Sequence, residues 1–175
     1  MTELAVILAL AFSSQFDASD PGIGGRVAWQ ATPLVGLEAE LVHYPGHFAG
    51  APAFSRSRVE GLVGATIGPR LGRVRPFGRV RPGFLRVHAA PEPIACLAIF
   101  PPPLACELAS GRTLTAFDVG GGVDVAVGER TFVRIDAGDR LVKYPGPVFD
   151  TDRNVHDEAF FSHDFRIALA GGVRF

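Results

Sequence analysis

The residue types most suggestive of catalysis stand together near the end of the chain, where Ser162, His163 and Asp164 are consecutive. A serine nucleophile, a histidine base and an acid can together catalyse acyl transfer. In a β-strand, however, neighbouring side chains point to opposite faces, so Ser162 and His163 could meet only across a bulge. We therefore expect no catalytic residues in this chain.

Candidate metal ligands are sparse. His43 and His47 flank a Tyr-Pro-Gly segment and could bind a metal, but two loop histidines are more often solvated. The triple glycine at 120–122 lies inside an expected strand, so it is not a phosphate-binding loop. Acidic residues that could hold Ca²⁺ lack the spacing of a known calcium loop: Asp17, Asp20, Asp150, Asp152, Asp157 and Glu158. We predict neither a metal nor a cofactor.

The pattern that organises the chain is a strict alternation over residues 161–175. Every second residue from Phe161 to Phe175 is apolar apart from His163 and Gly171, and the residues between them are charged or small. A period of two indicates a β-strand with one apolar and one polar face. The pattern holds to a terminal aromatic residue, which we interpret as the mark of a chain that closes on itself inside a membrane.

The same alternation recurs along the chain and predicts eight strands, at residues 3–16, 23–32, 35–44, 56–67, 74–87, 112–127, 131–143 and 161–175. A turn at 17–22 follows the first strand. The connections after the second, fourth and sixth strands are short, and those after the third, fifth and seventh are long, with 88–111 expected to be irregular. We predict an all-β fold, an eight-stranded antiparallel up-and-down transmembrane β-barrel. It forms a single domain over residues 1–175, and its last strand pairs with its first to remove both edges.

Two prolines interrupt the fifth of these strands. Pro76 and Pro82 each remove a hydrogen-bond donor from the ladder. We expect weakened pairing or a bulge at this point of the sheet.

Composition narrows the function classes. The net charge of −1 does not suggest nucleic-acid binding. Mean hydropathy is +0.24, yet the longest apolar run, Ala5 to Phe12, is too short for a transmembrane helix. Hydrophobicity spread in alternation is instead typical of a transmembrane β-barrel. Residues 1–14 lack a basic start and contain Glu3, so we interpret the chain as a mature one whose secretion signal is missing, with a signal peptide as the alternative.

Charged residues gather on the polar faces of the expected strands, with both signs on adjacent strands. Arginine–carboxylate pairs would fill the narrow interior of an eight-stranded barrel and satisfy one another's hydrogen bonds. We predict a plugged interior rather than an aqueous pore. The predicted interior network comprises Arg26, Glu38, Glu40, Arg58, Glu60, Arg79, Arg81, Asp118, Asp124, Arg134, Asp136 and Arg166, and Arg75 and Arg174 share the same faces.

A soluble barrel would use the opposite orientation. Its apolar faces would line the interior, and the chain would be a lipocalin-like protein that binds a small ligand. The face that is buried separates the two hypotheses. In a membrane barrel, aromatic residues near strand ends would form interfacial girdles, with Trp29 and Phe175 at one end and Phe12, Tyr44, Phe84, Phe117, Tyr144 and Phe161 at the other.

The last strand also carries a resemblance to a known family. Its alternating Phe165, Ile167, Leu169, Val173 and Phe175, with the segments 36–41 and 78–84, make the chain similar to the small eight-stranded outer-membrane barrels of Gram-negative bacteria, the OmpA/OmpX-like class. The resemblance implies an outer-membrane location in a monomer whose last strand faces lipid and is read by the barrel-assembly machinery. It implies a structural or surface-interaction role, with extracellular loops that contact lipopolysaccharide or external partners. A lipid A-modifying enzyme is a second alternative, because some barrels of this kind have that activity.

Both cysteines, Cys96 and Cys106, lie in a proline-rich segment that this class does not require. In an oxidising compartment they would form a disulfide that closes a short loop, and two reduced thiols are the alternative. We predict the disulfide.

Overall fold

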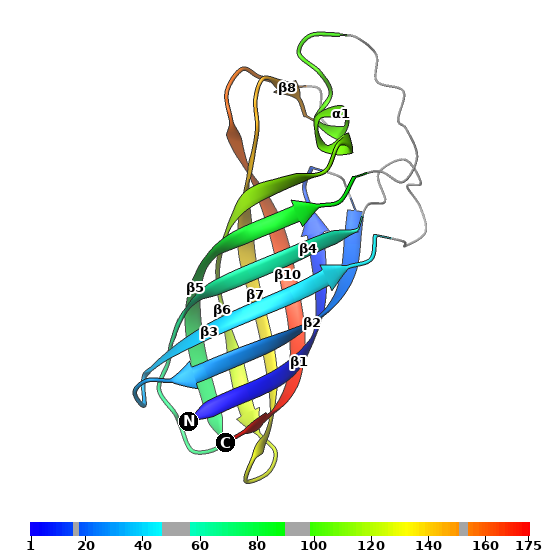
Figure 1. The fold of residues 1–175 in the computed structure, drawn as a ribbon. Helices are drawn as coiled ribbons and strands as arrows, with labels where there is room; N and C mark the ends of the chain where they lie inside the picture. Colours follow the sequence, from blue (N-terminus) through cyan, green and yellow to red (C-terminus); the bar gives the residue numbers. More distant parts are fainter. Residues whose placement is uncertain (16–17, 47–56, 90–98, 151–153) are drawn as a thin grey trace.

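Eight long strands form one closed antiparallel barrel in a computed structural model that describes residues 1–15, 18–46, 57–89, 99–150 and 154–175. Their order around the barrel is β1-β10-β7-β6-β5-β4-β3-β2. Two short strands, β8 and β9, form a separate hairpin near a short helix, α1 (Figure 1). The bounds are β1 (Thr2–Ser13), β2 (Ala18–Gln30), β3 (Val35–Tyr44), β4 (Arg58–Ile67), β5 (Val74–Val87), α1 (Leu104–Ala109), β6 (Arg112–Ala126), β7 (Thr131–Tyr144), β8 (Val148–Phe149), β9 (Val155–His156) and β10 (Phe160–Arg174). The closed barrel confirms the predicted fold class.

The barrel closes through its first and last strands. β1 and β10 pair along their whole length, with Leu8 opposite Leu169 and Phe12 opposite Phe165. Each long strand therefore has a hydrogen-bonded neighbour on both sides, and no edge is left open to another chain.

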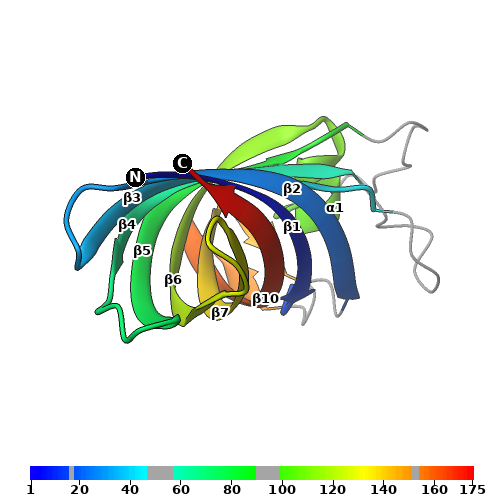
Figure 2. The same cartoon turned by 90° about the horizontal axis from the view of Figure 1, so that it is seen from below.

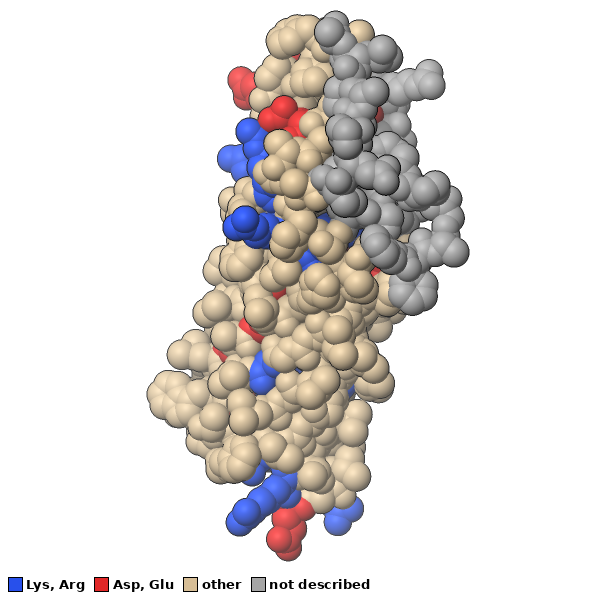
Figure 3. Space-filling view, turned by 45° about the vertical axis from the view of Figure 1, so that its right-hand side comes forward, with Lys and Arg blue, Asp and Glu red and all other residues tan. Residues whose placement is uncertain are grey.

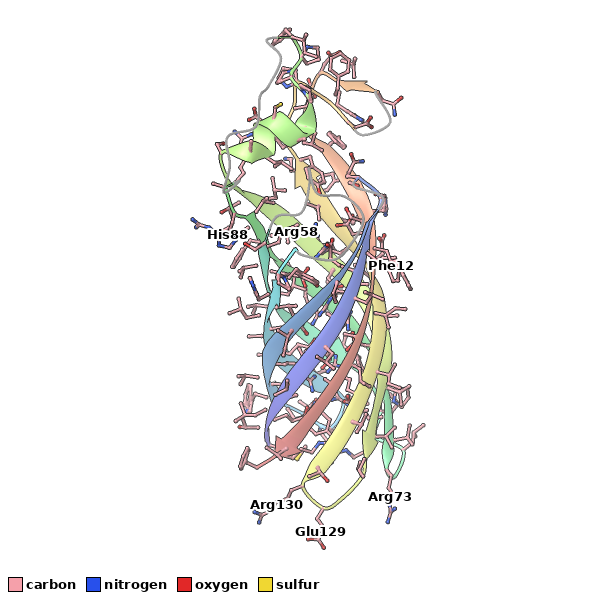
Figure 4. All side chains as sticks on the ribbon, turned by 90° about the vertical axis from the view of Figure 1, so that its right-hand side faces the viewer. Phe12, Arg58, Arg73, His88, Glu129 and Arg130 are labelled. Atoms are coloured by element: carbon pink, nitrogen blue, oxygen red, sulfur yellow. The ribbon has the colours of Figure 1, made fainter. Side chains whose placement is uncertain are left out.

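The two ends of the barrel differ. At one end, named here the turn end, both chain termini lie beside the short β2–β3, β4–β5 and β6–β7 turns (Figures 1 and 2). At the other, the loop end, β5 leads toward α1 and the β8–β9 hairpin follows β7 (Figure 1). Figure 4 places Arg73, Glu129 and Arg130 at the turn end, and His88 toward the loop end.

Side chains alternate between the outside and the inside of the wall. Along β1, Leu4 and Leu8 are exposed, whereas Ala5, Ala9 and Ala11 are buried together with the larger Ile7. The inner face of β10 likewise carries Ala168 and Ala170. Small residues on these paired strands leave space in the interior for long side chains from the opposite wall.

The prolines of β5 interrupt the ladder without a bulge. Pro82 pairs normally with Phe117 of β6, but toward β4 the register skips the positions opposite Pro82 and Arg81 and resumes unchanged at Val80. Because proline has no N–H, the missing donor is the physical cause of this gap. The expected weakening of strand pairing is therefore confined to the side of β5 that faces β4.

The predicted turn at 17–22 is wrong. β2 begins at Ala18, which pairs with Ser13, so the connection is shorter and Asp20 and Pro21 belong to the strand. Asp20 forms an ion pair with Arg58 of β4. This pair fixes Asp20 on the wall of the barrel, whereas its sequence neighbourhood has ordinary turn chemistry.

The segments predicted to be irregular also contain regular structure. α1 lies within 88–111, and β8 and β9 lie within the loop expected after β7. The helix begins after Pro103 and ends before Gly111, whose positive φ of 81° suits a helix terminus. At six residues, α1 is too short to show a helical period in the sequence. Among the described residues, no helix is long and apolar enough to span a membrane.

An apolar cluster closes the barrel beneath α1. The helix buries Leu104 and Leu108, which are one turn apart, against side chains from the inner faces of four strands. The members of this loop-end cluster are Leu62, Leu85, Val87, Leu104, Leu108, Leu114, Ala116, Val142, Tyr144 and Val148. The interior therefore changes from charged to apolar toward the loop end.

Two residues of the expected aromatic girdle lie elsewhere. Tyr44 and Tyr144 are buried inside the barrel. Each ends its strand on the inward side of the alternation, so neither reaches the outer surface. In contrast, Trp29, Phe12, Phe84, Phe117, Phe161 and Phe175 are exposed on the outside.

Close packing between β4 and β5 gives a test of this fold. A Cβ atom at Gly83 would clash with the backbone carbonyl oxygen of Gly61, whereas one at Gly171 would meet no atom within 4 Å. We expect Gly83→Ala to lower the free energy of unfolding by about 1–3 kcal/mol, because overpacking forces the backbone to move. Gly171→Ala is the matched control and should change it by less than about 0.5 kcal/mol. Denaturant titration followed by circular dichroism measures both, and equal effects would contradict the register.

Candidate functional site

The interior of the barrel is the most unusual part of the molecule, because it buries charge of both signs. Sixteen arginine, aspartate and glutamate residues among those described are buried there, eight arginines and eight carboxylates. They are Glu3, Arg26, Glu38, Glu40, Arg58, Glu60, Arg75, Arg79, Arg81, Asp118, Asp124, Arg134, Asp136, Arg140, Asp164 and Arg166. The equal numbers allow each charge to be matched without solvent.

Arg81 of β5 is the centre of this network. Its Nη1 donates to Glu38 Oε1 at 3.1 Å and to Glu40 Oε2 at 2.8 Å, both on β3. Its Nε and Nη2 donate to Asp118 Oδ2 of β6 at 3.0 and 2.8 Å. One guanidinium therefore joins three carboxylates from two different strands, through charge-assisted hydrogen bonds.

The network extends across the interior. Glu38 also accepts hydrogen bonds from Arg26 of β2 at 3.1 Å and from Arg134 of β7 at 3.0 Å. Because β7 and β3 lie on opposite sides of the closed barrel, the Arg134–Glu38 pair spans it. Arg166 of β10 binds Glu40 in the same transverse manner.

A second charge cluster lies toward the loop end. Arg140 of β7 binds Glu60 of β4, and its Nη2 donates to Asp164 Oδ2 of β10 at 2.7 Å. Asp164 also accepts from Ser13 Oγ of β1 at 3.1 Å. These contacts join β1, β4, β7 and β10 just below the apolar loop-end cluster.

Aromatic rings fill the space between the charged groups. Arg134 lies over the ring of Phe77 at 3.8 Å, and Arg174 lies over Phe132 at 4.5 Å. A guanidinium stacked on an aromatic face keeps favourable electrostatics without a hydrogen-bond partner. Buried phenylalanines therefore complete the packing around the arginines rather than forming a separate core.

The twelve residues predicted for the interior network are all buried in the barrel, and each lies within 4.0 Å of an oppositely charged partner. Sequence reasoning left out Glu3, Arg140 and Asp164, which belong to the same network. The signal for all three was present, since each lies on the inward side of its strand's alternation. Asp164 also belongs to the candidate catalytic trio with Ser162 and His163.

That trio is divided by the wall of the barrel. Ser162 and Asp164 point inward and are buried, whereas His163 points outward and its side chain is 70% exposed. The Nδ1 atom of His163 lies 2.6 Å from Asp139 Oδ2, a neighbour on β7. Ser162 pairs with Ser14, with 2.8 Å between their Oγ atoms. The three side chains therefore do not form a catalytic unit.

No group of three or more metal-ligating side chains occurs among the residues that the structure describes. His43 is exposed on the outer face of β3, and His47 lies outside the described residues. Cys106 lies on α1, and because Cys96 is also outside the described residues, their disulfide stays a prediction.

The outer surface shows the complementary pattern. Phe165, Ile167, Leu169, Val173 and Phe175, predicted to face lipid, are all exposed. In Figure 3 the middle of the visible face is mostly free of charged side chains, which gather near the two ends. Among described residues, the outer strand positions that carry charge or histidine lie toward the loop end, at His43, Arg86, Asp139, Lys143 and His163.

Comparison with known proteins identifies the architecture. No family model matches the chain, and no curated protein matches its sequence. The crystal structure of Neisserial surface protein A is similar over 99% of this chain and 96% of that chain, with 16% identity and a TM-score of 0.58. Ail, the attachment invasion locus protein of Yersinia pestis, is similar over 99% and 96%, with 13% identity and a TM-score of 0.53. The chain thus has the fold of the small eight-stranded outer-membrane β-barrels.

The role of the Arg81 network can be tested by mutation. Arg81→Ala would leave three buried carboxylates without their shared cation, so we expect a loss of about 3–5 kcal/mol in the free energy of unfolding. Arg86→Ala removes an exposed arginine from the outer face of the same strand and should change it by less than about 0.5 kcal/mol. Urea titration followed by the fluorescence of Trp29 measures both values. Equal losses for the two variants would show that the buried network does not stabilise the barrel.

The β8–β9 hairpin provides a test that depends on pH. Burial raises the pKa of Asp150, but hydrogen bonds from His156 and Asn154 outweigh this and lower the pKa below its usual value. The resulting stabilisation is present above the ordinary aspartate pKa of about 3.9 and is lost as pH falls through the lowered value. We expect Asn154→Ala to move the Asp150 pKa back toward normal in a carboxyl NMR titration. An unchanged pKa would show that the Asn154 side chain does not lower it, because the variant keeps the backbone N–H bond from residue 154 to Asp150.

Proposed function

We propose that this chain is an integral outer-membrane barrel of a Gram-negative bacterium, with a structural or surface-interaction role exerted at its loop end. The observation that carries the proposal is that charged side chains face the interior and apolar side chains face outward, the reverse of a soluble protein. The interior holds balanced charge, and the exterior is apolar on every long strand. Exposed residues from the middle of the eight strands include Leu8, Val27, Leu41, Val63, Val80, Val119, Ile135 and Leu169.

The exterior supports a lipid environment because its apolar residues form a continuous belt. Contiguous exposed apolar surface of this kind is rare on soluble monomers and marks a membrane or partner interface. A lipocalin-like carrier would need the apolar faces inside, around its ligand. Here the inward faces carry the arginine–carboxylate network, which supports the membrane orientation and disfavours the carrier.

The interior supports a structural role rather than transport. Arg81, Glu38 and Arg134 cross the interior, and the apolar cluster under α1 closes the loop end. A solute could pass through the barrel only if these ion pairs were broken, and the charges left unpaired would be costly. We infer a plugged monomer whose contacts with other molecules lie on its outside.

The residues at the loop-end edge of the apolar belt support contact with lipopolysaccharide. Phe84, Thr115, Lys143 and Phe161 lie opposite one another on four adjacent strands, so they form one row on the outer face. The ammonium of Lys143 lies 5.9 Å from the ring centre of Phe161. Aromatic residues beside a cation suit the boundary between acyl chains and anionic headgroups. Arg86 lies one outward position beyond Phe84 and extends the cationic edge.

The last strand is also proposed to be read by the barrel-assembly machinery. Its alternate residues Phe165, Ile167, Leu169 and Val173 are exposed, so a binding partner could contact them before the barrel closes. This role belongs to assembly and is separate from the function of the finished barrel.

An outward arginine separates the membrane proposal from a soluble protein. In lipid, Leu169→Arg should lower the free energy of unfolding by about 2–4 kcal/mol, because arginine is costly near the middle of the bilayer. Leu71→Arg, in the exposed β4–β5 turn, is the matched control and should cost about 0–1 kcal/mol. Folded fractions are measured from heat-modifiable gel migration after refolding into vesicles across a urea series. If Leu169→Arg were neutral and the chain folded without detergent, the exterior would face water.

A further inference from the structure

A cavity of about 350 Å³ opens at the turn end of the barrel. The β2–β3 turn contributes Thr32 and Pro33 to its wall, and the last residue of β2, Gln30, lies beside them. The β4–β5 connection contributes Arg70, and β5 contributes Arg75. The cavity is therefore lined by two turns that the closed barrel brings together, with Met1 beside them, and it shares only Arg75 with the interior network described above.

Arg75 is coordinated differently from the other interior arginines. Its closest carboxylate oxygen is Asp124 Oδ2, at 3.6 Å from Nη1 and beyond hydrogen-bond distance. Within hydrogen-bond distance it meets neutral acceptors: the Gly68 carbonyl oxygen and Thr66 Oγ1, both at 3.4 Å, and the Gln30 side-chain amide oxygen, which accepts from both Nη atoms. Each of the other arginines in the described network has a carboxylate oxygen at 3.1 Å or closer. Arg75 is only 3% exposed, so its charge is buried, and it is hydrogen-bonded to neutral groups while its carboxylate partner lies beyond hydrogen-bond distance.

The surroundings of the cavity favour an anion. Arg70 is exposed and lines the same cavity as Arg75. The turns at this end also carry Arg73, Arg130 and Glu129, so these three residues together have a net positive charge (Figure 4). The carboxylate of Asp124 would repel an anion, but Asp124 is not among the residues that line the cavity. Two guanidinium groups facing one space are suited to the planar, bidentate recognition of phosphate oxygens.

Thr32 adds a neutral donor. Its Oγ1 accepts hydrogen bonds from the backbone N–H groups of Leu34 and Val35, at 3.3 and 2.9 Å. The hydroxyl hydrogen can therefore be donated to a ligand. The turn geometry that forms these bonds fixes the hydroxyl at the wall of the cavity.

We propose that this turn-end cavity binds a phosphate group between Arg75 and Arg70. The favoured ligand is the headgroup phosphate of an anionic phospholipid. The lipid source is favoured because exposed Trp29, Leu34 and Leu71 each adjoin a lining residue in sequence, so acyl chains could follow the apolar belt while the headgroup enters the cavity. The assignment to a lipid rests on the proposed membrane location. Binding of a phosphate group does not.

The first experiment uses inorganic phosphate as the probe, with the refolded full chain in a maltoside detergent that contains no phosphate. Sodium phosphate is titrated against sodium chloride at equal ionic strength, and the arginine Nε–H and Thr32 amide signals are followed by NMR. We expect a saturable shift at Arg75 and Thr32. Arg75→Gln and Arg70→Gln should each weaken binding by about tenfold or more, because each removes charge-assisted hydrogen bonds.

Arg73→Gln is the matched control, since Arg73 lies in the same β4–β5 connection without lining the cavity. It should change binding by less than about twofold, because an exposed charge outside the site acts only through a screened field. Arg70→Gln, at an exposed position, keeps the test informative if Arg75→Gln does not fold. Absence of a saturable shift in the unmodified chain, or equal weakening by Arg73→Gln, would overturn the proposal.

The second experiment identifies the source of the phosphate. Native mass spectrometry of the chain with phosphatidylglycerol, and with diacylglycerol as the lipid lacking phosphate, should show retention of phosphatidylglycerol alone. Arg75→Gln or Arg70→Gln should abolish that retention. A response to inorganic phosphate without retention of phosphatidylglycerol would overturn the lipid assignment and support a free anion as the ligand. The phosphate titration remains interpretable even if the chain proves not to reside in a membrane.

Discussion

The matching of buried charge inside a closed wall is the constraint on which this structure depends. Eight arginines and eight carboxylates are held in a space where an unmatched charge is costly. Arg81 illustrates the solution, because its single guanidinium neutralises Glu38, Glu40 and Asp118 at once. Other pairs, Arg134–Glu38 and Arg166–Glu40, join strands that are distant in sequence and lie across the interior, so they form only when the barrel has closed. Closure and charge matching therefore require one another, and the exterior is left to the apolar side chains.

Other features follow from fitting long charged side chains into a narrow barrel. Alanines on the inner faces of β1 and β10 provide space for arginines from the opposite strands. Phe77 and Phe132 lie against guanidinium groups and fill the remaining volume. Toward the loop end the network gives way to an apolar cluster under α1, which separates the charged interior from the loop connections. At the turn end the described residues form no such cover, and Arg75, whose hydrogen-bond acceptors are neutral, lies beside an open cavity.

Much of this architecture could be predicted because successive side chains of a β-strand point to opposite faces, so apolar and polar residues alternate in the sequence. The pattern placed Val35–Tyr44 and Val74–Val87 at their observed bounds, and it placed the apolar face of the last strand on the outside. It failed where local chemistry conflicts with tertiary structure. Asp20 and Pro21 have turn chemistry but lie in β2, where an ion pair to Arg58 holds Asp20. A position near a strand end suggests an outer aromatic girdle for Tyr44 and Tyr144, but both lie on the inward side of their strands' alternation. The helix α1 is too short for a period, and the partners of each charge depend on register, which one sequence does not reveal.

The central claim is that the apolar faces contact lipid while the charged faces are enclosed. It is tested most directly by spin labels placed singly along residues 162–173 of β10, in a Cys96→Ser, Cys106→Ser background reconstituted in lipid vesicles. Collision rates with oxygen, which partitions into lipid, and with a water-soluble nickel complex are then measured at each position. The structure predicts that Phe165, Ile167 and Leu169 are accessible to oxygen and protected from nickel, while Arg166, Ala168 and Ala170 between them are protected from both. High nickel accessibility at Phe165, Ile167 and Leu169 would contradict the account, because it would place the apolar wall in water.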